Sequence, residues 1–178
     1  MLRPGLVRFI AVAVAASVLA SSASTAAATS RAPVHELAEI TDAGEWQWPI
    51  RRFRVVEPYL QPAHRYGAGH RGLDLAPIDD TEVRSPAPGM VAFAGTVADR
   101  PLVTIDHGEG LVTTLEPVTA RVEVGAVVSS GEIIGELAFG GHTAPGAVHF
   151  GVRYEGEYIN PLVLLGGVPR AVLLPCCD

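Results

Sequence analysis

The chain has 178 residues, enough for one domain of ordinary size, and 48% of them are hydrophobic. Its formal net charge is −6, it shows no basic cluster and it contains no lysine, which argues against a nucleic-acid partner because phosphates require Lys and Arg patches. Its two cysteines are adjacent, Cys176 and Cys177, which excludes a framework of separated disulfide pairs and leaves cross-linking to another chain as the alternative to a free thiol pair.

Residues 1–28 have the pattern of a secretory signal peptide. Two arginines give a positive start, Phe9 to Ala20 form an uncharged apolar run, and Ala26 to Ala28 provide an A-x-A cleavage site. A membrane anchor is the alternative, but a spanning helix needs about 20 apolar residues and this run is shorter. We therefore expect export and cleavage, which would remove both arginines and change the net charge from −6 to −8.

The rest of the chain predicts an all-β domain. Residues 29–44 are polar and Ala-rich without a sustained period, so we interpret them as a linker; residues 45–166 form the domain and residues 167–178 a C-terminal tail. Short β-branched runs separated by Gly and Pro predict an antiparallel sandwich or barrel-like core. The expected strands lie at 52–56, around 83, and at 90–94, 102–106, 111–115, 121–124, 127–128, 132–137, 148–154 and 158–159. We expect turns at Gly89, Gly95, Gly125, Gly131 and Gly135.

The segment Gly69 to Ala76 carries the first chemical signal. In an extended chain His70, Gly72 and Asp74 share one face, and Gly72 leaves an open space where an ion can sit between the imidazole and the carboxylate. Taken alone, a histidine near an aspartate on a strand is more often a solvated pair.

The segment Ala147 to Arg153 carries the second signal. Val148, Phe150 and Val152 alternate as a buried stripe, which places His149 on the opposite face beside Gly151. Together the two segments offer two histidines and one carboxylate. That is a catalytic type of zinc set, which leaves a fourth position for water.

Several motifs resemble the lysostaphin/LytM-type family of zinc endopeptidases. They are Gly69 to Leu75, Ser85 to Val91, the glycine-punctuated hairpin Val124 to Gly135, Val148 to Val152, and Asn160-Pro161. The resemblance covers roughly residues 46–165 and implies an antiparallel β core in a protein that cuts peptide cross-links of bacterial peptidoglycan at the cell wall. It also implies that His70, Asp74 and His149 hold one zinc ion.

The sequence departs from the family pattern at two positions. The family has a histidine two residues before the second metal-binding histidine, and here that residue is Ala147. A further histidine follows a Thr-x-Tyr-x pattern in the family, but here Pro117 occupies its place and Leu115 replaces the tyrosine. A positioned acid or base contributes about 10²–10⁴-fold to such a reaction, and one oxyanion donor about 10²–10³-fold. The sequence thus resembles the metal site without its proton-handling side chains.

Three other residues are candidates for the missing proton chemistry. His142, in a glycine-rich loop before the His149 strand, is our candidate catalytic residue, and an exposed loop histidine is its alternative. Glu116 is a second candidate, with a solvated surface carboxylate as the commoner interpretation. His107 ends an expected strand, where structural hydrogen bonding is the default role. Our hypothesis is that zinc is retained and that His142 or Glu116 handles the proton.

Two functions are consistent with these residues. One is a zinc endopeptidase that acts on peptidoglycan peptides, and the other is a zinc-retaining domain that binds the wall or regulates another wall hydrolase. A lipoyl- or biotinyl-type carrier is excluded because its attachment requires a lysine, which the chain lacks. After signal cleavage we expect no membrane partner.

Overall fold

The computed structural model describes residues 46–140, 143 and 145–166. The predicted signal peptide and linker, the C-terminal tail with both cysteines, and His142 lie outside the described residues, so these predictions stay open. Within the described part of the chain, no helix has the length and apolar character needed to cross a membrane.

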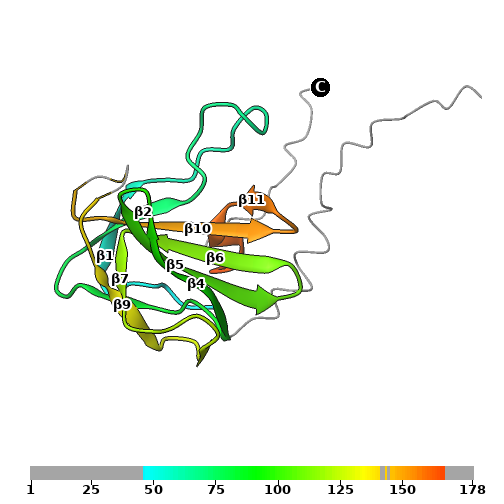
Figure 1. The fold of residues 1–178 in the computed structure, drawn as a ribbon. Helices are drawn as coiled ribbons and strands as arrows, with labels where there is room; N and C mark the ends of the chain where they lie inside the picture. Colours follow the sequence, from blue (N-terminus) through cyan, green and yellow to red (C-terminus); the bar gives the residue numbers. More distant parts are fainter. Residues whose placement is uncertain (1–45, 141–142, 144, 167–178) are drawn as a thin grey trace, which may run out of the picture. The chain divides into compact units, whose positions relative to one another are not determined.

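The described residues form eleven strands and one short 3-10 helix (Figure 1). In chain order they are β1 (Phe53–Glu57), β2 (Leu73–Pro77), β3 (Glu82–Arg84), β4 (Gly89–Val97), β5 (Arg100–Gly108), β6 (Leu111–Glu116), β7 (Val118–Ala120), β8 (Val127–Val128), β9 (Ile133–Leu137), β10 (Val148–Tyr154), β11 (Glu157–Ile159) and η1 (Pro161–Val163). Most strands are rich in Val, Ile, Leu and Thr, side chains that fit a pleated and half-buried surface.

The strands form two antiparallel sheets, which confirms the predicted all-β class. The larger sheet runs β1-β2-β10-β6-β5-β4-β8, and the smaller one runs β3-β9-β7. Strand β10 is central: β6 pairs along one of its edges, while β2 and β11 share the other edge, β2 at residues 148–150 and β11 at residues 152–154 (Figure 1). Segments far apart in the sequence therefore meet at β10.

The core lies on one face of β10. Val148, Phe150 and Val152 are fully buried, as their alternation predicts, and they join one cluster that also takes side chains from the smaller sheet. Truncation of a buried Phe to Ala typically costs about 3–5 kcal/mol. This burial fixes which face of β10 points to the core and leaves His149 on the other face.

Two details of the predicted strands were wrong. The expected strand at 121–124 is a turn, and the neighbouring strand is β7 at Val118–Ala120, because Val118 is buried in the core whereas Val124 is 61% exposed. Three glycines expected in turns belong to strands: Gly89 begins β4, Gly95 lies inside β4 and Gly135 lies inside β9. At Gly135 a Cβ atom would lie 2.5 Å from the Thr119 carbonyl oxygen, so close strand packing requires glycine there.

Candidate metal centre

His70 is oriented by the backbone that precedes β2. It forms a two-way backbone bridge with Leu60, at N···O distances of 2.9 and 3.0 Å. Its ring Nδ1 lies 2.8 Å from the Pro58 carbonyl oxygen. Because a carbonyl only accepts, Nδ1 is the protonated nitrogen of the neutral ring and Nε2 presents its lone pair to the site. A metal-binding histidine is commonly oriented in this way.

Asp74 and His149 are direct neighbours across β2 and β10. The Asp74 Oδ1 atom lies 3.0 Å from His70 Nε2 and 2.8 Å from His149 Nδ1, and the two ring nitrogens lie 3.1 Å apart. All three side chains are buried. Two ligands of a tetrahedral zinc ion, each bound at about 2.0–2.1 Å, lie about 3.3 Å apart. Two imidazole nitrogens and one carboxylate oxygen in this arrangement fit a small cation.

The charge state of Asp74 also suits a cation. Burial raises the pKa of its carboxyl group, but the hydrogen bonds and electrostatic interactions with His149 and His70 outweigh burial, so the net pKa lies below its ordinary value of 3.8. At neutral pH the carboxylate is therefore ionised, as a metal ligand must be.

Two glycines make room for the His149 ring. A Cβ atom on Gly72 would lie 2.6 Å from His149 Cε1 and Nε2 and 2.5 Å from the Phe150 carbonyl oxygen. A Cβ atom on Gly151 would lie 3.3 Å from His149 Nε2. The expectation that Gly72 leaves space for the ion itself was wrong, because the imidazole ring occupies that space.

A third side chain continues the line formed by Asp74 and His149. Glu116, at the end of β6, is the direct cross-strand partner of His149, and we call Asp74, His149 and Glu116 the site row. Directly opposed residues of an antiparallel pair project from the same face. Glu116 is 6% exposed, and Arg100 of β5 contacts its Oε1 at 3.4 Å. The expectation of a solvated carboxylate was therefore wrong.

The two positions where the family pattern has helper histidines are buried here. Ala147 and Pro117 both lie below the surface, and neither side chain ionises or donates a hydrogen bond. Pro117 also lines a hollow of about 230 Å³ together with residues of the segment before β10. The walls of this hollow are largely apolar.

His107 lies away from the candidate metal centre. Its Nδ1 lies 2.8 Å from the Pro88 carbonyl oxygen and its Nε2 lies 2.8 Å from Thr113 Oγ1, while Trp46 packs against the ring at a centroid distance of 4.9 Å. Burial lowers the pKa of His107, and the hydrogen bond to Pro88 and the charge of Asp106 offset only part of that effect. The expected structural role agrees with these contacts.

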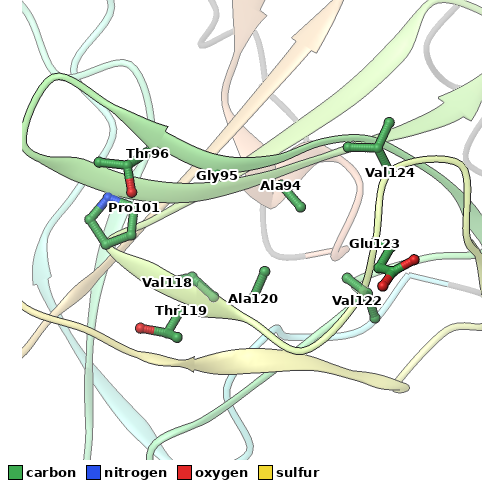
Figure 2. Close-up of a pocket in the computed structure, with 10 residues that line it drawn as sticks. All are labelled: Ala94, Gly95, Thr96, Pro101, Val118, Thr119, Ala120, Val122, Glu123 and Val124. Carbon is green, nitrogen blue, oxygen red and sulfur yellow. The ribbon is translucent and has the colours of Figure 1, made fainter.

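A separate hollow of about 410 Å³ lies between β4, β7 and the turn after β7 (Figure 2). Its lining is mainly small and apolar, with Glu123 as its single ionisable residue. It contains none of the three candidate ligands, which among the described residues form the cluster His70, Asp74 and His149 within 4.8 Å.

The three candidate ligands lie together as the sequence predicts, but two contacts at the site have no signal in the sequence. The carbonyl of Pro58 carries no side-chain signal, so its bond to His70 leaves no trace in the sequence. The contact between Arg100 and Glu116 joins adjacent strands across sixteen positions, and it becomes visible only once β5 and β6 are paired.

Comparison with known proteins supports this description. The model of peptidase family M23 matches residues 68–161, just over half of the chain. An uncharacterized protein of Mycobacterium tuberculosis is 37% identical over 145 residues, which covers 78% of this chain and 56% of that protein. The chain thus spans about half the length of that relative.

Two further relatives have names that state a function. The DD-carboxypeptidase/endopeptidase Mpg of Neisseria meningitidis is 30% identical over 118 residues, covering 64% of this chain and 27% of Mpg. The murein hydrolase activator EnvC of Escherichia coli is 29% identical over 131 residues, covering 69% of this chain and 29% of EnvC. The chain therefore matches less than a third of either protein.

Two solved structures share the fold. The catalytic domain of lysostaphin from Staphylococcus simulans has a TM-score of 0.55 and 20% identity, and the match covers 64% of this chain and 92% of that chain. A zinc-containing peptidase from Vibrio cholerae has a TM-score of 0.57 and 19% identity, covering 67% of this chain and 39% of that chain. The fold, the family match and the ligand motifs agree, and the chain belongs to peptidase family M23, the lysostaphin/LytM-type family.

Proposed function

We propose that this protein is an exported zinc endopeptidase that cuts peptide cross-links of bacterial peptidoglycan. The observation that carries the proposal is the set of three ligand atoms, from His70, Asp74 and His149, within 4.8 Å of one another. A set of two histidines and one carboxylate leaves a coordination position open, which is typical of catalytic rather than structural zinc sites.

The side chains of this protein would hold and orient the ion. His70 and His149 offer ring nitrogens, Asp74 offers an ionised oxygen, and the Pro58 carbonyl fixes the His70 ring. Zinc bound there would polarise a peptide carbonyl and make a bound water more acidic.

The relatives support a role at the cell wall. Mpg is named as a carboxypeptidase and endopeptidase, and EnvC as a murein hydrolase activator. The predicted signal peptide supports export, and purified peptidoglycan is accordingly the substrate to test.

The decisive experiment measures zinc content and digestion of purified peptidoglycan with the same preparation. We expect about one zinc ion per chain and release of peptide products. His149→Ala removes one of three ligands, so we expect it to lose both zinc and at least 100-fold of the activity. Absence of both zinc and products from the wild-type protein would contradict the proposal.

A second function is favoured by Ala147 and Pro117, which leave both helper positions without ionisable groups. It is a zinc-retaining domain that regulates another peptidoglycan hydrolase, as the name of EnvC suggests for that relative. Bound zinc without products, together with faster digestion by an added peptidoglycan hydrolase, would select this function over the first.

A further inference from the structure

We propose that Glu116 is the proton-transfer residue of this site and replaces the helper histidines that are absent at positions 147 and 117. The inference rests on the proposed peptidase function and adds a named side chain to it. It follows from the position of Glu116 in the larger sheet, its burial and its contact with Arg100.

Glu116 lies in the larger sheet in one row with two of the candidate ligands. Glu116 opposes His149 across β6 and β10, and His149 opposes Asp74 across β10 and β2. Side chains at directly opposed positions start about 4.5–5.5 Å apart at their Cβ atoms and share one face. Glu116 is not a member of the three-residue ligand cluster. It therefore lies beside His149 in the sheet without belonging to the ligand cluster.

The Glu116 side chain is also buried. A carboxylate that is 6% exposed has lost most of its contact with water, and this loss is costly unless polar partners compensate. Arg100 supplies one such partner at 3.4 Å, and its side chain remains 35% exposed. The buried carboxylate is thus held in place by a partly exposed arginine.

A second glutamate, Glu57, also lies beside a candidate ligand. Glu57 opposes Asp74 from β1, but it is exposed and follows an irregularity in strand pairing at residues 55–57. Water competes for a proton at an exposed carboxylate. Glu116 is buried and adjoins Pro117, which lines the hollow of about 230 Å³.

The proposed step adds one water molecule across one peptide bond. As the water oxygen bonds to the carbonyl carbon, the Glu116 carboxylate takes a proton from that water. It passes the proton to the amide nitrogen as the C–N bond breaks. The products are one carboxyl and one amine group, and Glu116 returns to its ionised form. A glutamate positioned for such transfers contributes about 10²–10⁴-fold.

The experiment compares Glu116→Gln with two matched variants in the full chain. Glu57→Gln removes the other carboxylate beside the ligands, and Glu136→Gln removes the acid of an exposed pair with Arg121 in the smaller sheet. Each variant is measured for zinc content, melting temperature, kcat and KM on peptidoglycan fragments, and affinity of the zinc-loaded protein for acetohydroxamic acid. That probe gives up a proton to a neighbouring base when it binds, so its affinity reports on Glu116 without peptidase turnover.

For Glu116→Gln we expect zinc content and KM to stay near the wild-type values. We also expect kcat to fall at least 100-fold and acetohydroxamate affinity at least 10-fold, with no such change in Glu57→Gln or Glu136→Gln. Wild-type acetohydroxamate affinity in Glu116→Gln would overturn the inference. It would also be overturned if His142→Ala showed these losses of kcat and affinity and Glu116→Gln did not.

The experiment also distinguishes a variant that fails to fold from a wild-type protein that has no peptidase activity. If Glu116→Gln fails to fold or to hold zinc, Glu116→Asp retains the charge but withdraws it by one methylene, and a kcat equal to that of the wild-type protein would overturn the inference. If the wild-type protein digests nothing, the proposed peptidase function fails. The acetohydroxamate comparison then still decides whether Glu116 serves the metal site.

Discussion

At the scale of single residues, the candidate centre depends on two glycines as well as on its three candidate ligands. His70, Asp74 and His149 converge because Gly72 and Gly151 leave the His149 ring its space. The alternation of buried residues in β10 predicted the direction of His149 from the sequence. The role of Gly72 could not be predicted in the same way, because it depends on contact with a residue 77 positions away.

Gly72→Ala tests this close approach. The new Cβ atom would lie 2.5 Å from the Phe150 carbonyl oxygen and 2.6 Å from the His149 ring, so one of them must move. We expect zinc affinity to fall about 10- to 100-fold, as for loss of an orienting contact, and stability to fall by about 1–3 kcal/mol.

Titration of each purified protein with zinc against a competing chelator measures the effect. Gly95→Ala is the matched control, because its Cβ atom would meet only the tip of the Phe93 ring, at 3.2 Å. Unchanged zinc affinity in Gly72→Ala would contradict the close packing of Gly72 against the His149 ring.

His107 gives a second residue-scale prediction, for the pH dependence of stability. Burial lowers its pKa in the folded protein below the ordinary value of 6.5. The unfolded chain therefore binds the proton more tightly, so the contribution of neutral His107 to stability is complete above about pH 6.5. It is lost as the pH falls from there through the lower pKa of the folded state.

Urea denaturation of zinc-free protein at several pH values between 5 and 8 measures this effect. We expect the free energy of unfolding to decrease toward pH 5, and His107→Gln to show a weaker decrease because glutamine does not titrate. Equal slopes for the two proteins would show that His107 is not responsible.

At the scale of elements, strand pairing decides what the sequence alone leaves open. The motif of β10 predicted its bounds, because the hydrophobic residues Val148, Phe150 and Val152 alternate along it without interruption. The run at 121–124 contains as many hydrophobic residues as a short strand, yet the structure pairs β7 at Val118–Ala120 with β9 instead. Likewise the sequence predicts that Glu116, the last residue of β6, is exposed, because its neighbours β10 and Arg100 are distant in sequence and become known only from the fold.

At the scale of the whole described domain, the proposed metal binding would be linked to folding. The three candidate ligands come from both sides of the β2–β10 pairing, and His149 lies 75 and 79 positions from the other two in sequence, so an unfolded chain does not hold them together. A ligand that binds only the folded state stabilises it by about 2.7 kcal/mol at one hundred times its dissociation constant.

We therefore expect zinc to raise the melting temperature of the wild-type protein relative to protein treated with a chelator. The difference should vanish in His149→Ala. It should also shrink toward acidic pH, because protons compete for the ligand atoms. Scanning calorimetry with and without zinc at pH 5 and pH 7.5 checks both statements, and a zinc effect that survives in His149→Ala would place the ion elsewhere.

The site row has one further consequence. Side chains alternate along a strand with a period of two, so sliding β10 by a single residue against its neighbours would turn Phe150 toward the ligands and His149 into the core. The packing of Val148, Phe150 and Val152 on the buried face of β10 thus fixes the register that places His149 beside Asp74 and Glu116. Substitutions that weaken this packing should move the candidate metal ligands apart while most of the sheet stays folded.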